Sequence, residues 1–97
     1  MRTDRTRSSP ADLPGAELVE KGLSDLARNV ESIDSLLVSI GASRLAALGM
    51  DVRSPILRAE HRLYALLAAE DSDSAHSRYN ALVRRLVSFE RAAECAV

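Results

Sequence analysis

A run of apolar residues repeats every three and four positions between residues 19 and 40, and it restricts this stretch to a helix. Alternating steps of four and three place all its members on one helical face, as in a heptad seam. Pro14 suits a first helical turn, and Gly41 follows the run where a left-handed residue would end a helix. The pattern predicts one helix over residues 14–40, about 39 Å long. The seam consists of Val19, Leu23, Leu26, Val30, Ile33, Leu37 and Ile40.

The remainder of the chain carries further helical signals. Ser43 can cap a short helix over about 43–48, and Ser54-Pro55 has the signature of a helix start, which predicts a helix over about 54–70. A second apolar repeat predicts a helix over about 74–95. No segment alternates apolar and polar residues as a strand would. We therefore expect an all-α fold, a small bundle of three long helices and one short helix, with antiparallel neighbours because the loops are short.

Length and composition set the domain organisation. The chain has 97 residues, so residues 13–97 are expected to form a single helical domain with a small core. Residues 1–12 lack apolar periodicity and carry three arginines among Ser, Thr and Pro, which is typical of a disordered basic arm. The net charge of −1 gives no global attraction to nucleic acid. No apolar run has the length of a membrane span, so we expect no membrane partner.

Few residues are suited to catalysis or metal binding. Cys95 is the only cysteine, which excludes an internal disulfide and a zinc site built from cysteines. Glu60 and His61 are adjacent in the sequence, so they face different sides of a helix and do not form a Glu-x-x-His motif. We predict no catalytic residue, no metal and no cofactor. The enzymatic alternative is a small helical enzyme whose site contains Glu60, His61, His76 and Tyr79.

The length of the first predicted helix raises the question of a second chain. A compact globule of this size is about 32 Å across, less than the length of that helix. The seam must then be covered by the last helix or by another protomer, so we predict a homodimer or a protein hetero-complex. Gly22 beside the seam costs about 1 kcal/mol against Ala unless a neighbouring backbone comes close. The predicted partner-binding residues are Leu23, Leu26, Val30, Ile33, Leu37, Arg78, Tyr79, Arg84 and Arg85.

These features indicate a broad functional class and not a specific activity. The chain has twelve arginines against a single lysine, Lys21, which indicates a GC-rich and therefore bacterial origin. We interpret it as a non-enzymatic cytoplasmic interaction protein that binds itself or a protein partner through the apolar seam. Antitoxins, immunity proteins and other small regulators have this character. The nucleic-acid alternative is a dimeric DNA-binding transcriptional regulator that uses the basic arm with Arg53 and Arg58.

Overall fold

The structure is a computed structural model that describes residues 13–96. These residues form helices and no strand, which confirms the all-α fold class. The expected arm, residues 1–12, lies outside the described residues, as does Val97. The helices are α1 (Ala16–Ala27), α2 (Ile33–Ile40), α3 (Ala42–Ala47), α4 (Ala59–Glu70) and α5 (Ala75–Ala96).

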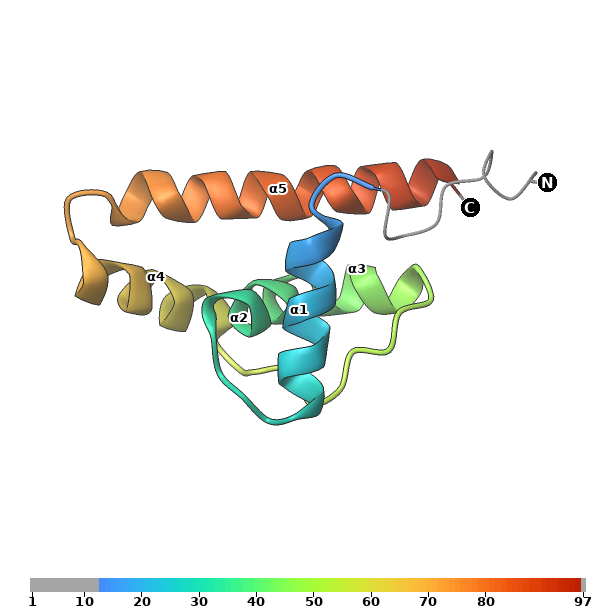
Figure 1. The fold of residues 1–97 in the computed structure, drawn as a ribbon, viewed down its shortest axis with the longest axis horizontal. Coiled ribbons are helices and arrows are strands. Elements are labelled where there is room, and N and C mark those ends of the chain that lie inside the picture. The colour runs from blue at the N-terminus through green and yellow to red at the C-terminus, as the bar shows by residue number, and fades with distance from the viewer. Residues whose placement is uncertain (1–12, 97) are drawn as a thin grey trace.

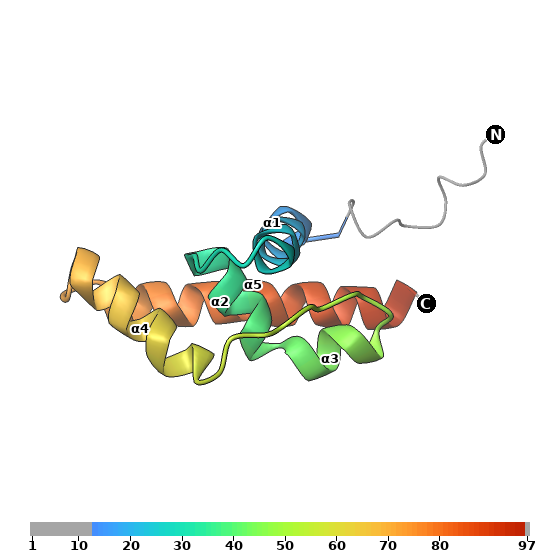
Figure 2. The same cartoon turned by 90° about the horizontal axis from the view of Figure 1, so that it is seen from below.

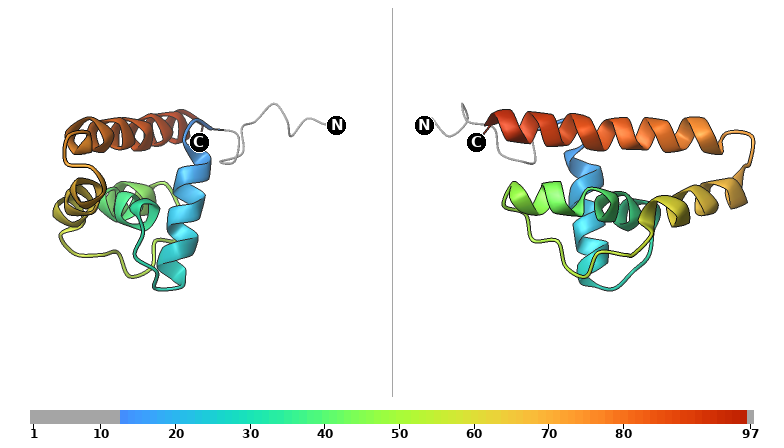
Figure 3. Two further views of the ribbon diagram at one scale, coloured as in Figure 1. Left: turned by 60° about the vertical axis from the view of Figure 1, so that its left-hand side comes forward. Right: turned by 180° about the vertical axis from the view of Figure 1, so that it is seen from behind.

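The long helix α5 forms one layer, and α4, α2 and α3 lie in a row beneath it (Figure 1). The first helix, α1, stands steeply across one side of both layers and is seen end-on from below (Figure 2). Helices α4 and α5 form an antiparallel hairpin that projects at one end (Figure 3). The molecule is elongated, with extents of 48 × 26 × 18 Å.

The core centres on α2, which contacts every other described helix. Leu36, Leu37 and Val38 of α2 are fully buried. The other helices contribute at least one large buried side chain each, and α5 supplies the largest, Phe89. Burial of this apolar surface is the main stabilising term, at about 1.5–3 kcal/mol for each fully buried large side chain. The buried large side chains outside α2 are Val19, Leu26, Leu45, Leu63, Leu67, Leu86 and Phe89.

The single helix expected over residues 14–40 is corrected to two helices, because the chain turns between residues 28 and 32. Asn29 adopts a left-handed conformation with φ of 60°. Its N–H donates to the Leu26 carbonyl at 3.0 Å, and the Val30 N–H donates to the Asp25 carbonyl at 2.8 Å. This pair of bonds is a Schellman motif, which satisfies the last carbonyls of α1 and ends it.

Ser32 then starts α2 with a capping box. Its hydroxyl accepts from the Ser35 N–H at 3.0 Å, while its own N–H donates to the Ser35 hydroxyl at 2.7 Å. The two bonds satisfy donors that a helix start leaves free. Asn29 and Ser32 are therefore the local signals that override the apolar repeat.

The carboxylate of Asp25 joins the end of α1 to the start of α2. The residue is only 1% exposed. It accepts hydrogen bonds from Lys21 at 2.9 Å, from Arg28 at 2.5 Å and from the Ser32 hydroxyl at 2.7 Å. The bond from Lys21, followed by that from Ser32, lowers the pKa of Asp25 below its ordinary value. The ionised carboxylate is thus compensated by three donors, as burial of a charge requires.

At Gly22, the backbones of α1 and α2 lie close together. A Cβ added there would lie 2.3 Å from the Asp34 carbonyl oxygen and 2.7 Å from Val38 Cγ1. Any side chain at this position would force the helices apart, so the close backbone approach accounts for the glycine.

The shorter elements differ from expectation in three details. Gly41 has φ of −95°, so it is not left-handed, and it instead gives room to Glu90 and Leu86 of α5. The N-cap of α3 is Gly41 and not Ser43, although Gly49 does end this helix region in a left-handed conformation. The helix expected from residue 54 begins at Ala59. Ser54 is left-handed, and the Ile56 N–H donates to the Ser39 hydroxyl of α2 at 2.9 Å.

Candidate partner-binding groove

The nine predicted partner-binding residues fall into four groups. Leu26 and Leu37 are buried in the core of the protomer, and Leu23 is partly buried and packed against that core. Val30 lies on the turn after α1 and is 39% exposed. Tyr79 packs its ring on Tyr64, with centroids 5.8 Å apart, within the α4–α5 hairpin. The remaining four, Ile33, Arg78, Arg84 and Arg85, line two adjoining hollows on one side of the molecule.

These hollows share Ala81 and Arg85 and together form what we call the α1–α5 groove. One hollow, of about 400 Å³, lies between α1, the start of α2 and α5. The second, also about 400 Å³, lies between the segment before α1 and α5. The groove is lined by Pro14, Gly15, Leu18, Ile33, Asp34, Arg78, Ala81, Leu82, Arg84, Arg85 and Ser88.

The groove depends on how the start of α1 sits on α5. Gly15 is left-handed, with φ of 79°, and a Cβ there would lie 2.9 Å from the Arg85 carbonyl oxygen. Glu17 accepts a hydrogen bond from Arg85 at 2.7 Å, which joins the acidic first helix to the basic last helix within one protomer.

The three arginines that line the groove differ in whether they form an ion pair. Arg78 pairs with Glu70 at 2.9 Å, and Arg85 pairs with Glu17. Arg84 makes no ion pair within residues 13–96. Asp34 is the one acidic lining residue, and burial is the main cause that raises its pKa, opposed by Lys21 at 3.8 Å. An apolar floor with basic side chains at its margin can hold an apolar side chain and orient a neighbouring acid.

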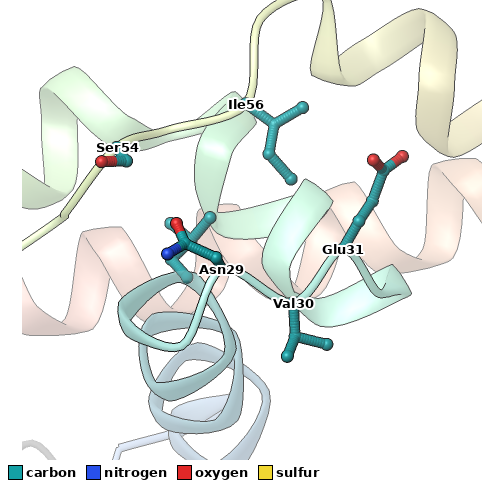
Figure 4. Close-up of a pocket in the computed structure, with 6 residues that line it drawn as sticks. Asn29, Val30, Glu31, Ser54 and Ile56 are labelled. Carbon is teal, nitrogen blue, oxygen red and sulfur yellow. The ribbon is translucent and has the colours of Figure 1, made fainter.

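A smaller hollow of about 140 Å³ lies beside the turn between α1 and α2 (Figure 4). Its lining includes Asn29, Ser54 and Ile56. The carboxylate of Glu31 points away from the hollow, and it forms two hydrogen bonds with Arg62 of α4, at 2.6 and 3.0 Å. Among the described residues that line this hollow, Glu31 is the only acid or base, and Arg62 holds its carboxylate.

The residues of the enzymatic alternative are only partly brought together. Tyr79 lies near Glu60, whose carboxylate adds to the effect of burial in raising the pKa of the tyrosine. His61 lies in the first turn of α4, far along that helix from the connection to α5, whereas His76 lies in the first turn of α5, beside the connection. His76 is exposed and bonds Asn80 at 3.2 Å. Within residues 13–96, no three His, Cys, Asp or Glu side chains gather as metal ligands would.

The residues of the DNA-binding alternative lie in the connection before α4. Arg53 pairs with Asp51 at 2.9 Å, and Arg58 is left-handed at the N-cap of α4. Helix α3 ends at Ala47 and α4 begins at Ala59, so the connection is longer than the short turn of a helix-turn-helix motif.

The groove residues that the sequence did not indicate are Pro14, Gly15, Leu18, Asp34, Ala81 and Ser88. The first three lie on or before α1 and reach the groove only because α1 folds back. Leu82 belongs to the apolar repeat of α5 and was predictable as a helix-face residue but not as a groove residue.

No protein-family model matches the chain, and no curated protein or solved structure is significantly similar to it. None of the described helices is both long and apolar enough to span a lipid bilayer.

Proposed function

We propose that this protein is a non-enzymatic, cytoplasmic interaction protein that binds a protein partner in the α1–α5 groove. The single observation that supports this function is the convergence of Ile33, Arg78, Arg84 and Arg85, from two helices, on the two adjoining hollows. An exposed apolar surface with a polar rim is the usual form of a protein-binding site.

The proposed role is that of a small bacterial regulator, an antitoxin or an immunity protein that masks its partner. The helix composition and the excess of arginine over lysine support this class. The partner is either a second copy of the chain or a different protein, and the groove is the proposed contact in both cases.

A photo-cross-linking experiment tests the proposal. Benzoylphenylalanine is introduced at Ala81, which is exposed and shared by both hollows, and separately at Ala69, an exposed alanine of α4 outside the groove. We expect irradiation of cells that contain the full chain to give a discrete protein adduct, identified by mass spectrometry, from position 81 only. Equal adducts from both positions, or none from position 81, would contradict the proposal.

A further inference from the structure

We infer that the partner docks into the α1–α5 groove as an acidic amphipathic helix of about three turns. This inference rests on the proposed function and adds the chemistry of the partner.

The shape of the groove sets the length of the bound segment. The lining residues of α5 extend from Arg78 to Ser88, which corresponds to about 15 Å along a helix axis and to about three turns of a partner lying beside it. Leu18, Ile33 and Leu82 are partly buried and form an apolar floor from three helices. A floor of this kind receives apolar side chains spaced three or four residues apart on a helix.

The charges of the groove select acidic flanking residues. Arg84 is exposed and has no ion pair within the described part of the chain. Its guanidinium can therefore form a new ion pair with a carboxylate of the partner. Arg78 and Arg85 lie at the margin of the same surface, but each already pairs with a carboxylate of this chain, so Arg84 carries most of the preference for acids. Asp34 lies on the α2 side of the hollow, opposite α5, and it would repel an acidic residue of the partner. Acidic residues of the partner are therefore favoured along α5 and not across the apolar floor. A nucleic acid would use the arginines but would leave the apolar floor empty.

The helices described between residues 13 and 96 give a second copy of the chain no helix of this kind. Among the described helices, large apolar side chains are exposed at Tyr64, Leu66 and Val87. Tyr64 and Leu66 are two positions apart and therefore face different sides of α4. Val87 lies three residues from Arg84 and four from Arg91, so its face would bring arginine against arginine. The described helices thus favour a different protein as the partner.

Two labelled peptides test the inference with the full chain. Each is a fourteen-residue designed helix, about four turns, with Leu on one face and either Glu or Lys at all flanking positions. Fluorescence anisotropy measures the affinity of each peptide at low and at physiological salt. We expect the Glu peptide to bind at least about tenfold more tightly than the Lys peptide, with a preference that decreases as salt is added.

Three variants locate the binding. Ala81→Trp fills the shared centre of both hollows and should weaken the Glu peptide at least about tenfold, whereas Ala69→Trp, the matched control on α4, should leave it unchanged. Arg84→Glu should remove or reverse the preference for the Glu peptide. Circular dichroism confirms that these exposed substitutions leave the helices intact.

Three other results would each contradict a specific part of the inference. If the Lys peptide binds as tightly and Ala81→Trp still weakens both, the groove remains a docking site and only the acidic class is wrong. If Ala81→Trp affects neither peptide, the inference is wrong, while an adduct at position 81 would still support the proposed function. If light scattering gives a dimer mass that Ala81→Trp reduces to a monomer, the occupant is a second copy.

Discussion

At Gly22, the absence of a side chain allows the backbone of α1 to contact that of α2. The glycine packs against the Asp34 carbonyl and Val38, and no larger residue fits there. Helical propensity alone would favour alanine at this position by about 1 kcal/mol. Because of this tertiary contact, alanine at position 22 should destabilise the fold, although helical propensity alone would predict that it stabilises the fold.

We predict that Gly22→Ala lowers the free energy of unfolding by about 1–3 kcal/mol, because an added methyl group overpacks the helix contact. Urea unfolding measures the change. Ser24→Ala, an exposed substitution in the same helix, serves as the control and should change stability by less than about 0.5 kcal/mol. Equal or greater stability of Gly22→Ala would show that α1 and α2 do not meet at this residue.

Two buried acids give the stability a pH dependence with opposite signs. The pKa of Asp25 is lowered by its donors, so its stabilisation is complete above the ordinary value of 3.8 and is lost as pH falls through the lower folded pKa. The pKa of Glu90 is raised, mainly by burial and further by Glu94, and opposed by Arg44. Its ionisation therefore destabilises the fold at neutral pH, and this cost disappears as pH falls through the raised pKa toward 4.5.

We predict that Glu90→Gln is more stable than the unsubstituted chain at pH 7 and that the difference shrinks as pH falls toward 4.5. Urea midpoints at a series of pH values measure it. Glu20→Gln is the control, because Glu20 is an exposed acid of α1 with no ion pair within residues 13–96, and it should show a much smaller change. A constant difference between Glu90→Gln and the unsubstituted chain at all pH values would show that Glu90 does not titrate abnormally.

At the scale of the element, the capping residues decide where the helices end. The steps of three and four continue through the break because α1 and α2 bury their apolar faces in the same core, with Leu26 on one helix and Leu37 on the other. Periodicity does not distinguish this arrangement from one long helix. Asn29 and Ser32 do distinguish them, since both are residue types that end or start helices.

We predict that Ser32→Ala destabilises the protein by about 1 kcal/mol, because it removes the capping box and one donor to Asp25. Thermal unfolding followed by circular dichroism provides the measurement. Ser43→Ala is the control, since α3 has no side-chain cap, and it should fall within about 0.5 kcal/mol of the unsubstituted chain. Equal effects of the two substitutions would argue against the capping box.

Other elements were predictable from local signals. The second apolar repeat predicts a helix over about 74–95, and α5 spans Ala75–Ala96. The Ser54-Pro55 signature failed because Ser54 is left-handed and Ile56 bonds to Ser39 of α2, a contact that the local sequence does not reveal. Tertiary contacts therefore set this helix start.

At the scale of the whole molecule, the fold-back of α1 creates the groove. Ile33, Arg78, Arg84 and Arg85 could be selected from the sequence as candidates, because apolar and basic helix faces are visible there; that they bind a partner stays a prediction. That these residues lie beside Leu18 and Gly15 could not be predicted, because this arrangement requires the chain to turn at residues 28–32 and α1 to lie on α5. One continuous helix over 14–40 would leave no such surface.

The most direct test of the fold-back is the nuclear Overhauser effect between the Gly22 α-protons and the Val38 methyl groups. The structure places these groups in contact, so a clear cross-peak is expected. In one continuous helix the two residues would be about 24 Å apart, far beyond the range of the effect. Absence of the cross-peak in a folded, assigned sample would contradict the turn between α1 and α2, and with it the groove.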